Sequence, residues 1–295
     1  MTENQHNKNL HIIRNEIDAI DNQIIDLIKK RMSIIPRVSE LKKNNNEKFY
    51  IKSAREADMV KNLVSKVEGN YLKQAIANIW RKIICVANME EQIFKIGIHN
   101  PRSIADYGYL VKDHFLAQVN IVNFNSATNL IAEMQNGLIN IGVFLLPHEN
   151  DDFEKKDSFQ ENWWINMANN QIGLKIYSKI PFVELSTDKK MSNIQLVLTA
   201  IKSPEQSMQD STIICLEANL QLTKSQIITL FKDNNFNAKI LKSVKIQQLS
   251  GIVFYLIELD GFYLEGDLNL KKLSQSIIKP FIKVLGHFPA PIILN

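Results

Sequence analysis

Residues 8–44 carry a heptad pattern, and this pattern constrains the fold of the 295-residue chain more than any other feature. Two heptad positions are apolar in every slot but one, which is Arg31: Leu10, Ile17, Ile24, Arg31 and Val38 at the first, and Ile13, Ile20, Leu27, Ile34 and Leu41 at the second. So narrow a seam predicts a long amphipathic helix that packs against another helix. At ~1.5 Å per residue the helix would be roughly 50 Å long, too long for its short neighbours to cover.

The arginine in this seam indicates an anion site, because a guanidinium group in a dry interface is costly unless an anion meets it. On a straight helix, Lys42 would lie on the same face as Arg31, about 16 Å away. Arg14 would lie roughly 25 Å from Arg31 along the axis, so it would reach the same anion only from a second copy of the chain. A coiled-coil helix with one awkward charge is the alternative. Pro36 should bend the helix.

Composition favours a cytoplasmic protein that binds neither nucleic acid nor membrane. Hydrophobic residues make up 45% of the chain, the net charge is +4, and no basic cluster with interleaved aromatic residues occurs. The N-terminus is polar, and no apolar run approaches the length of a membrane span. Cys85 and Cys215 are far apart and are expected to be reduced core thiols. No metal-ligand spacing and no glycine-rich phosphate loop is present, so no metal or cofactor is expected.

Two more helices are expected after a polar break at 44–48. Ser53 and Glu56 have the spacing of a capping box, which would open a helix reaching about residue 66. A third helix, from about 71 to 94, has an apolar stripe that includes Glu91. Because burial disfavours a charged carboxylate, Glu91 is expected to carry a proton near neutrality, unless its side chain turns out to water.

From residue 94 onward the pattern changes to strands that alternate with helices. Within 95–205 the order β-α-β-α-β predicts an α/β domain with a parallel or mixed sheet. Residues 202–207 are the best candidate for a linker. The segment 206–295 is predicted to be β-α-β-β-α-β, an α+β ferredoxin-like order, with a last helix at 270–282. The chain is thus expected to be multi-domain, with an all-α region at 8–94.

The residues that carry chemistry gather in the helical region, and they include no nucleophile: Arg14, Arg31, Lys42, Arg55, Glu56 and Glu91. The chain has six arginines, none after Arg102. In a chain that otherwise uses lysine, such clustering favours planar, bidentate recognition of anions, although chance is an equal explanation. These groups would bind and shape a dianionic substrate rather than attack it.

Residues 10–92 resemble the all-helical class of chorismate mutase. The matching pieces are Leu10–Asp21, Lys30-Arg31-Met32, Val38–Lys42, Arg55-Glu56 and Ile79–Ile84. The resemblance implies an intertwined homodimer of three-helix chains, in which each active site takes one arginine from the neighbouring subunit. It also implies the rearrangement of chorismate to prephenate, a step in phenylalanine and tyrosine biosynthesis.

The resemblance also implies a role for each site residue. Arg31 and Arg14 of the partner subunit would grip the two carboxylates of chorismate. Lys42, or failing it Lys43, would donate to the ether oxygen that breaks away. Glu56 would accept from the ring hydroxyl group, Arg55 would line the pocket, and Glu91 would lie beside the ether oxygen.

The sequence departs from the family pattern at two positions. Many members carry Asp where this chain has Lys52, and often Ser where it has Ala87. Recognition of the hydroxyl group would therefore rest on Glu56. If these changes spoil the pocket, the chain would instead be an inactive dimeric binding protein.

The remainder resembles, more faintly, prephenate dehydratase, which has a periplasmic-binding-like α/β domain and an attached ACT module. The traces are Ile139–Leu146 with Pro147-His148-Glu149-Asn150, and the ending Phe281–Pro289. The Thr-Arg-Phe signature of the dehydratase is missing near Asn193-Ile194-Gln195, and the phenylalanine-binding motifs of the ACT module are absent. A degenerate dehydratase region, kept for dimerisation, stability or a partner, is therefore expected. A bifunctional mutase–dehydratase is the alternative.

Overall fold

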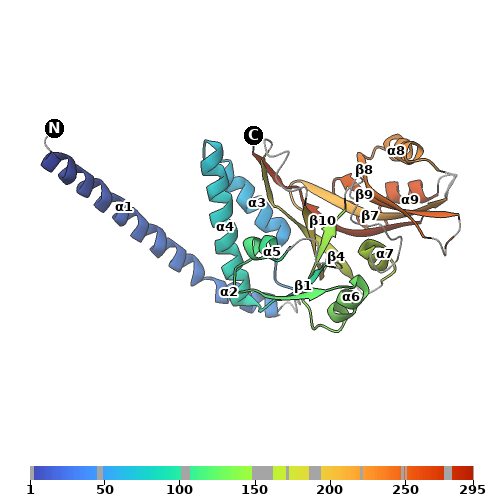
Figure 1. Ribbon diagram of the computed structural model, residues 1–295, viewed down its shortest axis with the longest axis horizontal. Helices are drawn as coiled ribbons and strands as arrows, with labels where there is room; N and C mark the ends of the chain where they lie inside the picture. The colour runs from blue at the N-terminus through green and yellow to red at the C-terminus, as the bar shows by residue number, and fades with distance from the viewer. Residues whose placement is uncertain are drawn as a thin grey trace. The chain divides into compact units, whose positions relative to one another are not determined.

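The computed structural model describes residues 3–44, 49–100, 107–147, 162–170, 173–185, 194–219, 222–246, 249, 251–275 and 281–294 (Figure 1). The chain divides into two compact units. The first comprises Met1–Tyr50 and Ile83–Ile93, and the second comprises Ile51–Lys82 and Phe94–Asn295.

The long helix expected at 8–44 is two helices, α1 (Glu3–Met32) and α2 (Ile35–Asn44). Pro36 explains the break. It has no N–H to donate to the carbonyl group of Met32, and its ring would collide with that carbonyl in a continuous helix. Proline is tolerated in a first turn, which is where α2 places it. The expected bend is therefore confirmed, but as a full interruption at residues 33–34.

The apolar seam of α1 and α2 lies on the surface of the described chain. Eight of its nine apolar residues are 37–67% exposed, and Val38 is partly buried; the eight are Leu10, Ile13, Ile17, Ile20, Ile24, Leu27, Ile34 and Leu41. An apolar surface of this extent on a protein marks a place of contact with another molecule.

Two helices follow, α3 (Ser53–Val64) and α4 (Asn70–Glu91). The predicted capping box is wrong: Lys52 occupies the N-cap position without a side-chain cap, and Ser53 is already the first helical residue. Helix α4 ends three residues earlier than predicted, and the buried Phe94 leads into the first strand. None of the described helices has both the length and the hydropathy needed to cross a membrane.

Nine strands among the described residues form one mixed sheet, in the order β2-β1-β3-β6-β4-β10-β7-β9-β8 (Figure 1). Their bounds are β1 Lys95–His99, β2 Asn120–Phe124, β3 Ile141–Leu146, β4 Leu174–Ile180, β6 Gln195–Ile201, β7 Asp210–Asn219, β8 Ala238–Lys245, β9 Ile252–Asp260 and β10 Phe281–Pro289. β1 is parallel to β2 and β3, and β6 is antiparallel to β3 and β4. A second sheet pairs β5 (Val183–Leu185) with β11 (Ile292–Leu294).

Short helices connect these strands: α5 Gly108–His114, α6 Ala127–Gln135, α7 Trp163–Ala168, α8 Lys224–Asp233 and α9 Leu268–Ser274. From β7 to β10 the order is β-α-β-β-α-β, as predicted, with β10-β7-β9-β8 antiparallel. The last helix is shorter than predicted. α9 ends at Ser274, and Phe281 and Ile282 belong to β10, a strand whose residues are buried from Val284 to Pro289. Residues 103–106 and 159–161, predicted to be helical, lie outside the described residues.

The core of the α/β region consists of two buried clusters. One gathers around Phe144, Trp163 and Trp164, and the ring centroids of Phe144 and Trp163 are 5.0 Å apart. The other packs Phe231 and Leu273, from α8 and α9, against β7 and β9. Strands from both halves of the region, 95–205 and 206–295, thus belong to one sheet because β10 pairs with β4.

Gly286 is the point where β10 meets β4, in register with Ile176. Its φ is 149°, and an added Cβ would lie 2.3 Å from the backbone oxygen of Ile176. Replacing Gly286 by alanine is expected to lower the free energy of unfolding by about 2–4 kcal/mol, since a backbone cannot yield as a side chain can. Gly251→Ala is the control, because Gly251 has φ 89° with open space around it and should cost only about 1 kcal/mol. Urea unfolding would measure both, and equal losses would contradict this account.

His99 makes the stability of the fold depend on pH. Its side chain, at the end of β1, is 3% exposed, and burial lowers its pKa from 6.5 to about 4. The unfolded chain therefore binds the proton more readily, so the stabilising contribution is complete above pH 6.5 and is lost as pH falls toward 4. The loss should amount to ~3 kcal/mol. His99→Leu should remove this component from a series of denaturant titrations at different pH, whereas replacing the exposed His11 by glutamine should leave it. A His99→Leu profile parallel to that of the unmodified protein would refute the assignment.

Candidate functional site

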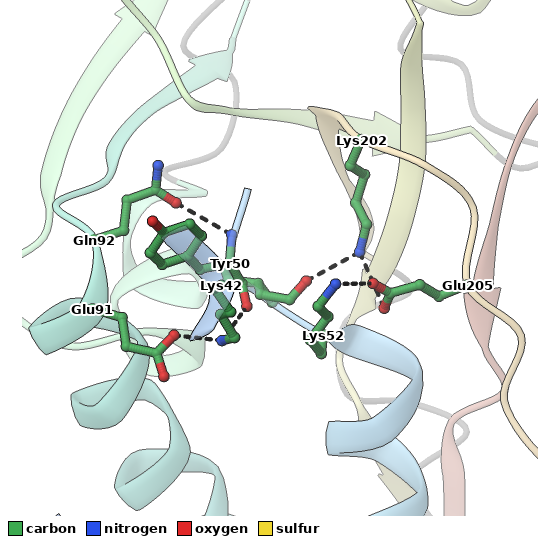
Figure 2. Close-up of polar contacts among 8 residues, drawn as sticks. Lys42, Tyr50, Lys52, Glu91, Gln92, Lys202 and Glu205 are labelled. Atoms are coloured by element: carbon green, nitrogen blue, oxygen red, sulfur yellow. Dashed lines mark hydrogen bonds and ion pairs between the residues drawn. The ribbon is translucent and has the colours of Figure 1, made fainter. Parts of the chain in front are cut away.

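Lys42 and Glu91 form the polar centre of the first unit (Figure 2). Lys42 lies in the last turn of α2, and Glu91 is the last residue of α4. Their side chains are 13% and 4% exposed, and Lys42 Nζ makes an ion pair with Glu91 Oε2. Lys42 follows from the heptad helix and Glu91 from the apolar stripe of the third helix, and the structure brings the two together. It thereby gives the Glu91 carboxyl group a cationic partner, which the sequence argument had not considered.

Residues just before α3 fix the position of the Lys42 ammonium group. Nζ donates to the backbone oxygen of Tyr50 at 2.9 Å and lies 5.4 Å from the centroid of the Tyr50 ring. Tyr50 is itself buried, and its backbone N–H donates to Gln92 Oε1 at 3.3 Å. Sequence reasoning missed Tyr50 and Gln92. A backbone carbonyl acceptor has no signature in the sequence.

The ammonium group of Lys42 can still bind a further acceptor. A lysine carries three N–H donors, and within the described residues the contacts with Tyr50 and Glu91 use two of them. A held, largely buried cation with one donor to spare is suited to an oxygen on which negative charge develops.

The arginines of α1 lie in the same unit. Arg14 is exposed, whereas Arg31, in the last turn, is partly buried with Nη1 4.0 Å from Met32 Sδ. Because α1 ends at Met32, Arg31 and Lys42 belong to separate helices, and the 16 Å spacing predicted for one straight helix does not apply. Ala87 is buried on α4 one turn before Glu91, so these two residues share a helix face.

The remaining predicted site residues, Arg55 and Glu56, lie in the first turn of α3, in the second unit. Arg55 is exposed and Glu56 is partly buried. Arg55 lines a groove of about 1230 Å³ between α3 and residues 205–209. Across this groove the backbone N–H of Met208 donates to Asp58 Oδ1 at 3.0 Å.

The predicted linker at 202–207 has no regular structure, but it is packed against the start of α3 (Figure 2). Lys202 has a side chain only 6% exposed, and its Nζ donates to the backbone oxygen of Ile51 at 3.1 Å. Glu205 pairs with Lys202 at 3.4 Å and with Lys52 at 3.3 Å. Lys52, noted in the sequence only as a departure from the family pattern, thus has a carboxylate partner. Sequence reasoning missed this cluster because its members lie about 150 positions apart along the chain.

Within the part of the chain that the structure describes, no three His, Cys, Asp or Glu side chains are placed to hold a metal ion. Cys85 and Cys215 are both buried, as predicted for core thiols.

Comparison with known proteins finds a family model that matches the helical region. Residues 13–92 match the family model described as chorismate mutase type II, and this range includes every site residue named above from α1 to α4. None of the curated proteins matches the chain.

Three solved structures are similar to a larger part of the chain. A prephenate dehydratase from Streptococcus mutans has a TM-score of 0.46 and 15% identity, covering 68% of this chain and 100% of its own. GqqA, described as a novel type of quorum quenching acylase, has a TM-score of 0.45 and 13% identity, covering 66% and 94%. A prephenate dehydratase from Arthrobacter aurescens, solved with L-Phe, has a TM-score of 0.45 and 11% identity, covering 66% and 90%.

Proposed function

We propose, from the chorismate mutase domain at residues 13–92, that this protein rearranges chorismate to prephenate. The observation that carries the proposal is the Lys42–Glu91 pair, held by Tyr50 within that domain. The reaction is intramolecular: one carbon–carbon bond forms while the ether carbon–oxygen bond breaks. No base and no covalent intermediate is needed. The protein has to select the folded conformer of the substrate and stabilise negative charge on the ether oxygen.

Lys42 is the proposed donor to the ether oxygen. Its contacts with Tyr50 and Glu91 hold the ammonium group in place before substrate arrives, so little reorganisation is needed as charge develops. Glu91 is the proposed second group at the same oxygen. An ionised carboxylate only accepts hydrogen bonds, so this role requires a proton on Glu91 when substrate is bound. In the free protein, Glu91 orients Lys42.

The proposed site is completed by a second copy of the chain. The exposed heptad seam of α1 supplies the contact surface, because two such helices would cover each other's apolar side chains. In that homodimer Arg31 and Arg14 of the partner subunit each bind one substrate carboxylate, for which a guanidinium group offers two parallel donors.

Arg55 and Glu56 are proposed to line the same substrate, with Glu56 accepting from the ring hydroxyl group. Ala87 adds only apolar surface beside Glu91, since it lacks the hydroxyl group that a serine would offer. Hydroxyl recognition is therefore assigned to Glu56 alone.

For the rest of the chain we propose a periplasmic-binding-like domain at 95–205 and an ACT-like domain at 206–295, following the helical domain at 8–94. The β-α-β-β-α-β order from β7 to β10 supports the second. We propose that this region has no dehydratase activity. Where the dehydratase signature would fall, Gln195 opens β6 and donates through Nε2 to Glu184 Oε1 at 3.1 Å. Of the three signature positions, Asn193 lies outside the described residues.

An assay with purified protein separates the alternatives. Chorismate should be consumed and prephenate should accumulate, while added prephenate should persist. Formation of phenylpyruvate would show a bifunctional mutase–dehydratase. If chorismate binds without turnover, the protein is a binding protein instead.

A further inference from the structure

We propose that Lys202 and Glu205, from the α/β region, are positioning residues for Glu56 and thereby determine how the ring hydroxyl group of chorismate is recognised. The proposal rests on the proposed function, which assigns that hydroxyl group to Glu56. It assigns Lys202 and Glu205 no contact with the substrate.

The geometry begins with the backbone before α3. Lys202 Nζ donates to the oxygen of Ile51 at 3.1 Å, and Glu205 pairs with the side chain of Lys52 at 3.3 Å. Lys52 is the N-cap of α3, and its side chain makes no cap. Two consecutive residues at the start of this helix are therefore held by the segment after β6, and Glu56 lies in the first turn that follows.

The charges in this cluster also support the proposal. Lys202 is a nearly buried cation with two carboxylates acting on it, those of Glu205 and Glu56. Burial lowers the pKa of Lys202, the attraction of Glu205 and Glu56 opposes that shift, and the nearby cation Lys52 adds to it. Because one charge acts more strongly on another where water is largely excluded, Lys202 contributes to the electrostatic potential at Glu56. An unpaired charge at such a depth would be costly, so Lys202 and Glu205 act as a unit.

This arrangement also accounts for the departure at Lys52. The resemblance places an Asp at this position in many relatives, on the helical domain itself. Here the side chain is a cation, and the carboxylate beside it, Glu205, comes from the segment between β6 and β7. A second carboxylate near the start of α3, besides that of Glu56, is thus supplied by the segment between β6 and β7, which gives the α/β region an indirect part in the site.

The test uses the full-length protein and two substrates: chorismate, and the analogue in which hydrogen replaces the ring hydroxyl group. Lys202→Met and Glu205→Gln remove the charges while keeping the side-chain volumes. Each should raise the KM for chorismate about tenfold with kcat changed less than about twofold, the effect expected when one charge-assisted contact is weakened. The KM for the analogue should not change. The double variant should be no worse than either single one, since the two residues act together.

Lys179→Met and Glu184→Gln are matched controls. They form an ion pair of similar length, 3.4 Å, between β4 and β5, and Lys179 is also nearly buried. Neither control should alter the KM. Thermal melting of all variants would show that they are folded, and Glu205→Gln, with the more exposed side chain, is the milder variant should Lys202→Met melt early.

Three results would overturn the proposal: an unchanged KM for chorismate, an equal rise in KM for both substrates, or additive effects in the double variant. An equal rise would mean that the two residues only stabilise the fold. Failure of the proposed function itself is recognised separately, because the unmodified protein would then turn over neither substrate.

Discussion

Replacing Lys42 by methionine is expected to lower kcat for the rearrangement of chorismate by about 10²–10³-fold, the usual cost of removing one donor from a developing oxyanion. Methionine keeps most of the side-chain volume at a position that is 13% exposed, so the fold should tolerate it. The change would also leave the Glu91 carboxylate, 4% exposed, without its cation. Steady-state kinetics together with thermal melting would separate the lost chemistry from lost stability.

Lys43→Met is the matched control for this prediction. Lys43 is the next residue of α2 and is exposed, and the sequence alone left it as the fallback donor. Its replacement should change kcat by less than about twofold, because exposed charges interact weakly with a buried centre. A large loss of kcat with Lys43→Met and a small one with Lys42→Met would show that Lys43, and not Lys42, is the donor.

Replacing Arg14 by alanine should lower kcat/KM by about a hundredfold or more, because one substrate carboxylate would lose its bidentate cation. If each chain built its site alone, no such loss of kcat/KM would be expected. Arg14 is exposed on α1, and its removal should leave the melting temperature nearly unchanged. The effect therefore depends on the second copy that the proposed site requires. Kinetics on the purified variant would measure it.

Arg37→Ala serves as the control, since Arg37 is an exposed arginine of α2 that has no place in the proposed site. It should keep full activity. If the two variants had the same activity, the role of Arg14 would be refuted.

The sequence predicted local structure well where the pattern had a regular period. The heptads of 8–44 predicted the amphipathic helices and their apolar face, and Pro36 predicted a disturbance. A proline inside a helix can either bend it or break it, because it removes one hydrogen bond and its ring clashes with a carbonyl group. The sequence pattern did not show that Pro36 would break the helix completely. The predicted capping box was wrong because α3 begins at Ser53 itself, one residue earlier than the spacing of Ser53 and Glu56 suggested.

Contacts between distant residues could not be predicted in this way. Lys42 and Glu91 were each selected, but their pairing depends on how α2 and α4 pack. The contact of Lys202 with Ile51 joins residues 151 positions apart, and it turns a segment that resembled a linker into part of the packed structure. The single sheet likewise depends on Gly286, where the absence of a side chain allows β10 to approach β4. No local pattern in the sequence encodes that approach.

The shared active site is tested most directly by mixing two inactive variants, Arg14→Ala and Lys42→Met, after reversible dissociation of the subunits. If each site uses Lys42 from one chain and Arg14 from the other, a mixed dimer has one intact site and one doubly defective site. Random reassociation should then restore about a quarter of the unmodified activity, given a two-fold symmetric dimer. No recovery, in a mixture shown to contain mixed dimers, would mean that each chain builds its site alone and would contradict the account.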